Sequence, residues 1–232
     1  MAECLVIGLD EQHFSNFCKR NEPTGIDFKT FPRRQRRSAG SHTKRCGFAW
    51  SGLLNASDRS GWRQCLSRGE VLAVFEDGAR LRDDFETQLQ TLLQRVTAWD
   101  LILFGCNMDT GVELAVTPHV SLNGRFSIAY PQLEHLAEFT KIRDAVELCR
   151  VLLAFGICGY AIGPRGADRL LPHCFPLDSR PVRLAASARR IRAYGVDCMM
   201  ADAYPKIRAL LCWPPLVMTP NEQRSSQIQR DA

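Results

Sequence analysis

The chain has 232 residues, of which 45% are apolar and 24% charged, the composition of an ordinary globular protein. No apolar run is long enough to cross a bilayer, and Met1–Gly8 is too short for a signal peptide, so we expect a cytoplasmic protein, free or at the inner face of the membrane. Ten cysteines occur singly with no C-x-x-C pair, which argues against a zinc site and a disulfide framework. The net charge of +5 suits phosphate-bearing ligands or an anionic membrane surface, and is weak for a dedicated nucleic-acid domain.

The first half of the chain predicts alternating strands and helices. Strands are expected where short apolar or alternating runs end in turn residues, at 4–7, 26–31, 71–75 and 100–105. Helices are expected where apolar residues recur on one face, at 12–20, 48–66 and 83–96. The strands 71–75 and 100–105, with the helix between them, predict a right-handed parallel crossover.

The second half predicts a less regular series. Its expected elements are a hairpin over 116–130 turning at Asn123-Gly124, a helix over 132–151, a glycine-rich strand over 155–163, a helix over 165–171, a basic helix over 181–194 and a final strand over 207–212. The sequence contains no internal repeat and no linker. We therefore expect residues 1–220 to form one α/β domain with a mixed, mostly parallel sheet flanked by helices, followed by a polar tail over 221–232.

Two adjacent carboxylates and a glycine follow the strand expected at 71–75. Residues of this strand are apolar throughout, which is typical of a strand buried on both faces of an α/β sheet. Glu76 and Asp77 stand at its carboxyl end, where such sheets bind ligands. The alternative is that the two acids begin the next helix, whose N-terminus favours negative charge.

The densest positive charge of the chain lies at 32–45, among serines and glycines. Arginine side chains there could grip a diphosphate or another polyanion. The alternative, a solvated loop, is the more common outcome for such runs. No aromatic residue is interleaved between Arg33 and Arg45, which weakens an interpretation as a single-stranded nucleic-acid site.

Six blocks of the chain, in this order, resemble glycosyltransferase family 25, which includes bacterial lipooligosaccharide galactosyltransferases and collagen galactosyltransferases. The blocks are Val6–Asp10, Ala73–Gly78, Trp99–Gly105, Gly159–Leu171, Gly195–Asp197 and Pro214–Val217. The resemblance covers most of the chain. It implies a GT-A-like fold and transfer of a sugar, typically galactose, from a UDP-sugar to a saccharide or lipooligosaccharide acceptor, with inversion, in surface-polysaccharide biosynthesis.

The same resemblance implies roles for individual residues. Gly8 and Asp10 would belong to the donor-binding strand end, Glu76 would contact the donor ribose or a metal-bound water, and Asp77 would hold a divalent metal, Mn or Mg. Asp197 would be the catalytic base, with Asp178 and Asp202 as substitutes. The alternative for Asp197 is a helix cap.

The chain also departs from the family pattern. Gly78 replaces the carboxylate expected as a metal ligand, Ser57-Asp58 stands where the family has Ser-His, and Gly8 replaces an asparagine. Metal affinity should fall unless Asp77, Asp83 or Asp84 takes over. Two other functions therefore stay open: a catalytically impaired binding protein on the same fold, and a polyanion-binding protein that uses the basic segments Arg33–Arg37 and Arg183–Arg192.

Overall fold

The computed structural model describes residues 2–7, 11–30, 48–128, 131–183, 190–193 and 195–220, without the side chains of 48–56. The basic run 32–45 and the polar tail 221–232 lie outside the described residues. The helices are α1 (Glu11–Arg20), α2 (Phe48–Arg68), α3 (Phe85–Arg95), α4 (Leu133–Phe139), α5 (Pro164–Cys174) and α6 (Val196–Ala203), with short 3-10 turns η1 (Glu22–Thr24) and η2 (Tyr204–Lys206). The strands are β1 (Glu3–Ile7), β2 (Lys29–Thr30), β3 (Leu72–Glu76), β4 (Arg80–Leu81), β5 (Leu101–Leu103), β6 (Gly111–Thr117), β7 (Val120–Arg125), β8 (Glu147–Leu153), β9 (Gly159–Ile162), β10 (Pro181–Arg183), β11 (Arg190–Arg192), β12 (Ala209–Trp213) and β13 (Val217–Met218).

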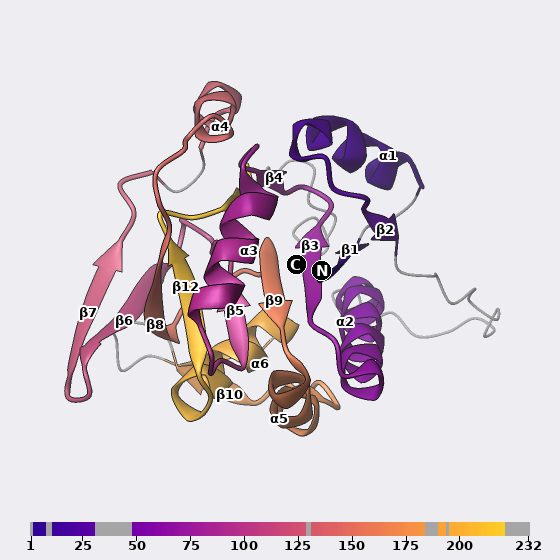
Figure 1. Cartoon of the computed structure of the whole chain (residues 1–232). Coiled ribbons are helices and arrows are strands. Elements are labelled where there is room, and N and C mark those ends of the chain that lie inside the picture. Colours follow the sequence, from indigo (N-terminus) through magenta and orange to yellow (C-terminus); the bar gives the residue numbers. More distant parts are fainter. Residues whose placement is uncertain are drawn as a thin grey trace.

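One nine-stranded sheet organises the molecule, in the order β2-β1-β3-β9-β5-β12-β8-β6-β7 (Figure 1). Parallel pairs join β1 to β2 and β3, and β5 to β12. β9 runs antiparallel between β3 and β5, so these two strands of the expected crossover are parallel without being neighbours. The expected α/β fold, a single domain with a mixed sheet flanked by helices, is confirmed. The expectation that the sheet is mostly parallel is wrong: five of the eight neighbouring pairs among the described strands are antiparallel, because β9 and β8 run opposite to both of their neighbours and β6 and β7 form a hairpin.

The helices cover the two faces of the sheet. One core contains buried side chains of α2, α5 and α6, including Trp62, Leu170 and Met199. The other contains side chains of α1 and α3, including Phe17 and Phe85, and α3 crosses this face in Figure 1. Side chains of β3 alternate between the two cores, as the period of a strand requires. Among the described helices, none has both the length and the apolarity to span a bilayer.

The helix predicted over 132–151 is wrong beyond its first two turns. α4 ends at Phe139, and β8 occupies the slot between β12 and β6. An apolar run as short as Leu148–Leu153 does not distinguish a helix from a strand by its periodicity. Pairing with two neighbouring strands decides the conformation here, because tertiary context overrides local propensity.

The basic helix predicted over 181–194 is also wrong in its described part. β10 and β11 form a two-stranded antiparallel hairpin. Val182 is buried between the exposed Pro181 and Arg183, which is the alternation of a strand with one covered face. The expected hairpin exists, but its turn was predicted at the wrong place. β6 and β7 turn at Pro118-His119 and not at Asn123-Gly124.

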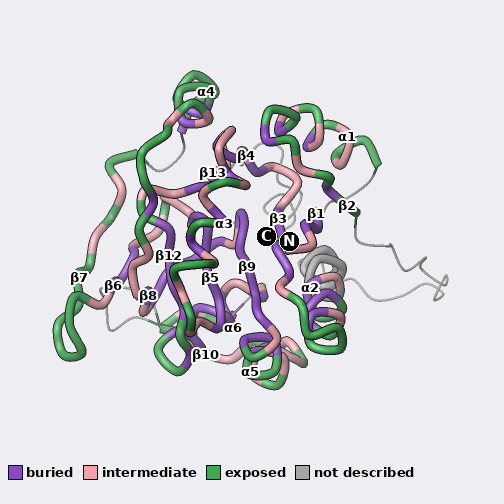
Figure 2. The backbone as a smooth tube through the Cα atoms, in the orientation of Figure 1, coloured by how far each residue is buried: buried purple, intermediate pink, exposed green. Residues whose placement is uncertain are grey.

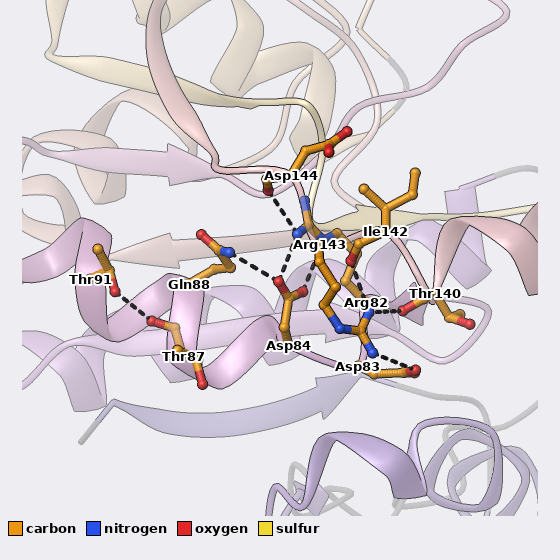
Figure 3. A network of polar contacts seen from close by, with 10 residues as sticks. All are labelled: Arg82, Asp83, Asp84, Thr87, Gln88, Thr91, Thr140, Ile142, Arg143 and Asp144. Atoms are coloured by element: carbon orange, nitrogen blue, oxygen red, sulfur yellow. Dashed lines mark hydrogen bonds and ion pairs between the residues drawn. The ribbon is translucent and has the colours of Figure 1, made fainter.

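A buried arginine ties the start of α3 to the connection between α4 and β8 (Figure 3). Arg82 donates from Nε and Nη2 to both oxygens of Asp84, at 2.9 and 2.7 Å, and from Nη2 to the carbonyl of Asp144 at 2.9 Å. Arg143 in turn donates to Asp83 Oδ2 at 3.1 Å. Planar guanidinium groups favour this two-pronged geometry, so the segment that follows the acidic turn is firmly anchored.

Candidate functional site

The register of the sheet brings the ends of β1 and β3 together. Ile7 lies opposite Glu76, and the Asp77 amide donates to the Ile7 carbonyl at 3.2 Å. On the other side, the Glu76 amide donates to the carbonyl of Cys158 at 3.1 Å. The apolar runs 4–7 and 71–75, both expected to be strands, are therefore a parallel pair whose carboxyl ends share one edge of the sheet.

The face on which Glu76 lies follows from strand periodicity. Val74 is paired with Tyr160 on β9, and both belong to the core covered by α2 and α6. Glu76 is two residues beyond Val74, so its side chain extends from the same face of the sheet. Glu76 therefore extends from the side of the sheet that α2 and α6 cover, one register step beyond the end of β9.

Asp58 reaches this region from α2. The hydroxyl of Tyr160 donates to Asp58 Oδ1 at 2.6 Å and accepts a hydrogen bond from Trp62 Nε1 at 2.9 Å. All three side chains are buried. Asp58 and Trp62 are four residues apart, which places them on one face of the helix, where both can bind the same hydroxyl. The resemblance had marked Asp58 only as a substitute for a histidine, and this arrangement was not predicted.

Asp197 enters from the first turn of α6. Its Oδ2 accepts a hydrogen bond of 3.4 Å from the Gly156 amide. A Cβ atom at Gly195 would lie 2.7 Å from Asp197 Oδ1, so the missing side chain leaves room for the carboxylate. The carboxylate also accepts a hydrogen bond from the Cys198 amide. The N-cap residue of α6 is Gly195 and Asp197 lies in the first turn, so Asp197 does not cap the helix as the alternative predicted. Its position at a helix N-terminus and its place near Glu76 are therefore compatible.

The neighbouring carboxylates influence each other's protonation. Burial raises the pKa of Glu76 to about 8, and the negative charges of Asp197, Asp77 and Asp58 act in the same direction. Burial raises the pKa of Asp58 to about 7, against the lowering effect of the Tyr160 hydrogen bond. Burial also raises the pKa of Asp197. Carboxyl groups that titrate near neutral pH can exchange protons with a substrate.

The described residues do not complete a metal site around Asp77. Among them, no group of three His, Cys, Asp or Glu side chains could hold a metal ion. The suggested replacements are engaged elsewhere, because Asp83 pairs with Arg143 and Asp84 with Arg82 (Figure 3). The backbone carbonyl of Asp77 accepts a hydrogen bond from Arg20. A divalent metal held through Asp77 would therefore need further oxygen ligands, such as water or the phosphates of a bound nucleotide.

The remaining predicted site residues fall in three places. Gly8 and Asp10 lie outside the described residues, directly after β1. Asp178 is exposed and forms an ion pair of 2.6 Å with Arg180. Asp202 pairs with His173 at 3.2 Å and Lys206 at 3.6 Å. Asp202 is five positions after Asp197 on α6, which is not a whole number of helical turns, so the two side chains lie on different sides of the helix.

Fold and site together define an α/β protein with an acidic site at the carboxyl ends of two parallel strands. No protein-family model matches the chain, and no curated protein matches it. Among solved structures, the chain is similar to a protein described as "Crystal Structure of A197 from STIV", with 11% sequence identity over 91% of this chain and 81% of that chain, and a TM-score of 0.40. At this low TM-score we transfer neither a family nor a function to the chain.

Proposed function

We propose that the protein is a glycosyltransferase that binds a UDP-sugar at the carboxyl ends of β1 and β3. It transfers the sugar, with galactose as the first candidate, to a saccharide acceptor in lipooligosaccharide or other surface-polysaccharide assembly. The observation that carries the proposal is the gathering of Glu76, Asp58 and Asp197 at the edge where α/β sheets bind ligands. The reaction class comes from the resemblance of the six sequence blocks to family 25.

Asp197 is the proposed base. The acceptor hydroxyl gives its proton to the Asp197 carboxylate while its oxygen bonds to the anomeric carbon, and the bond from that carbon to the UDP oxygen breaks with its electron pair. The Gly156 amide, 3.4 Å from Oδ2, orients the carboxylate. Gly195 leaves the space that this orientation needs. The described carboxylates do not complete a metal site, and the proposed proton transfer uses groups of the protein alone.

Titration calorimetry with UDP and UDP-galactose, with and without manganese, tests donor binding. We expect heat of binding and a raised melting temperature. Asp197→Asn should retain UDP binding and lose sugar transfer or UDP-sugar hydrolysis. Asp178→Asn, which changes an exposed carboxylate paired with Arg180, is the matched control. Absence of both heat and thermal shift with either ligand would end the proposal.

The second candidate is a binding protein on the same fold that has lost catalysis. Gly78, in place of a carboxylate, is the observation that favours it. A Cβ atom at Gly78 would lie 3.5 Å from its nearest neighbour atom, Thr219 Oγ1, so the backbone leaves room to begin a side chain there. Metal-dependent UDP-sugar hydrolysis gained by Gly78→Asp, but not by Gly124→Asp in open space on β7, would identify one lost ligand. A folded Gly78→Asp variant that binds UDP without turnover supports the binding role.

A further inference from the structure

The β6–β7 hairpin forms an open edge of the nine-stranded sheet. Among the strands that the structure describes, β7 is last in the order and pairs with β6 only. Nearly all of its residues are exposed, and the hairpin turn projects away from the body of the molecule in Figure 2. A strand in this position presents unpaired backbone groups on one side.

The outer part of the hairpin carries exposed apolar side chains and no charged ones. From Ala115 to Gly124 it contains no Asp, Glu, Lys or Arg, although such residues make up 24% of the chain. Val116, Val120 and Leu122 are 64%, 55% and 57% exposed. Exposed edge strands usually carry charges that prevent association, and this one carries none over these ten positions. A contiguous apolar surface of this kind is typical of an interaction site.

The apolar side chains continue a face of the hairpin that begins in the core. Leu122 lies directly opposite the buried Leu114 on β6. Val120 is two residues before Leu122 and therefore extends from the same face of β7. On β7 the apolar face thus runs from Leu122, opposite the core residue Leu114, to Val120 near the tip, while β6 has a bulge between Ala115 and Thr117.

A basic hairpin lies beside the apolar one. Arg183 on β10 donates to Glu113 Oε2 on β6 at 2.9 Å. On β11, Arg190 is the direct partner of Arg183, and Arg192 follows two residues later. Arg190 and Arg192 are both exposed. An apolar protrusion next to exposed arginines has the chemistry of a surface that contacts anionic lipids.

We propose that the β6–β7 hairpin docks the protein on an anionic membrane surface, with Val116, Val120 and Leu122 among the lipid chains near the headgroups. Arg190 and Arg192 then contact the lipid phosphates. A second copy of the chain is the less favourable occupant, because pairing two hairpins would bring their basic flanks together in a protein of net charge +5. This surface is separate from the acidic site and does not depend on the proposed enzymatic function.

Co-sedimentation with vesicles tests the docking surface. The full chain should bind vesicles of equal parts phosphatidylglycerol and phosphatidylcholine, and bind pure phosphatidylcholine vesicles much more weakly. The double variant Val120→Ser/Leu122→Ser should lower the binding constant about tenfold or more, because two apolar side chains are removed from the lipid. Leu133→Ser is the matched control, since Leu133 is 59% exposed on α4, outside the hairpin.

A second pair of variants tests the contribution of the arginines to vesicle binding. Arg190→Ser/Arg192→Ser should weaken binding about thirtyfold at low salt, the factor for about 1 kcal/mol from each arginine near an anionic surface. Arg63→Ser/Lys141→Ser removes the same charge from other exposed positions and should have a smaller effect. All altered side chains are exposed, and unchanged melting temperatures would show that the variants are folded. Equal binding of wild type and the Val120/Leu122 variant overturns the proposal, as does a dimer that this variant dissociates.

Discussion

Tyr160 on β9 donates a hydrogen bond of 2.6 Å to Asp58 on α2, across the core of the molecule. Trp62 fixes the direction of this bond, because its Nε1–H can only donate and occupies an acceptor position of the hydroxyl at 2.9 Å. The proton of Tyr160 therefore points to Asp58. The interaction holds a carboxylate of the acidic site at a defined place between helix and sheet.

The variant Tyr160→Phe should lower the free energy of unfolding by about 1–3 kcal/mol, because it leaves the buried Trp62 Nε1–H without its acceptor. Tyr204→Phe is the matched control: Tyr204 is equally buried, and its hydroxyl has no hydrogen-bond partner among the described residues. Its removal should change stability by less than about 0.5 kcal/mol. Urea denaturation of both variants measures the difference. Equal losses would show that the Tyr160 hydrogen bonds contribute nothing specific.

The carboxyl groups of the site also predict how stability depends on pH. Asp58 and Glu76 have pKa values of about 7 and about 8 in the folded protein, above their ordinary values of 3.8 and 4.5. At pH values between the ordinary and the raised pKa of each group, the folded protein binds more protons than the unfolded chain. The free energy of unfolding should therefore fall as pH rises from about 4 to about 8, by up to about 1.4 kcal/mol per pH unit for each group.

Asp58→Asn tests the contribution of one of these groups. An amide does not titrate, so the slope of stability against pH should be shallower in this variant up to about pH 7, where Asp58 would otherwise lose its proton. Urea midpoints measured at several pH values between 5 and 8 give the slopes. Identical slopes in the variant and the wild type would contradict the raised pKa of Asp58. Asp178→Asn, at an exposed position, should leave the slope in this range unchanged.

Local sequence signals predicted the part of the fold that holds the acidic turn. The apolar run before Glu76 forms β3, and Gly69, with φ +68°, ends α2 by donating its amide to the Cys65 carbonyl at 3.0 Å. Pro164 begins α5, as expected from its fixed φ. These features depend on neighbouring residues only. Contact between the carboxyl ends of β1 and β3 followed from one further rule, that parallel strands share an edge.

Features that depend on distant residues were not predicted. Asn123 and Gly124 favour a turn locally, but they pair with Glu113 and Val112 inside the hairpin instead. β8 is a strand because β12 and β6 lie on either side of it. The position of Asp58 needs the register of β9 against β3, which no pattern within α2 reveals. A carboxylate four residues from a tryptophan on a helix was the available signal, and it is weak without the tyrosine.

A buried aspartate explains why two of the blocks that resemble family 25 lie together. Asp100 accepts hydrogen bonds from Arg165 Nε at 2.6 Å, Arg169 Nη1 at 2.8 Å and the Arg208 amide at 2.7 Å. α5 can approach this closely because Gly166 has no side chain, and a Cβ atom there would lie 1.8 Å from the Asp100 carbonyl oxygen. These residues therefore have a structural role, because they hold α5 against the start of β5.

Gly166→Ala should therefore destabilise the protein by about 3 kcal/mol, since a backbone oxygen cannot move aside without shifting α5 or β5. Gly124→Ala is the matched control, because a Cβ atom at Gly124 meets no atom within 4 Å. We expect the control to change stability by less than about 0.5 kcal/mol. Thermal and urea denaturation measure both. A tolerated alanine at position 166 would mean that the helix has room to move.

The buried ion pair of Arg82 and Asp84 predicts a larger effect than an exposed pair in the same network. Arg82→Met removes a fully buried guanidinium group, which leaves Asp84 with Gln88 as its side-chain donor and takes one donor from the Asp144 carbonyl. We expect a cost of about 3–5 kcal/mol. Arg143→Met breaks the ion pair with Asp83. The Arg143 side chain is 52% exposed, so we expect this change to cost less than about 1 kcal/mol. Urea denaturation compares the two variants, which remove the same group from neighbouring positions (Figure 3). If Arg82→Met cost no more than Arg143→Met, burial of the Arg82–Asp84 pair would not contribute to stability. The segment after the acidic turn would then be anchored by its backbone, where the Arg82 amide donates to the Leu216 carbonyl.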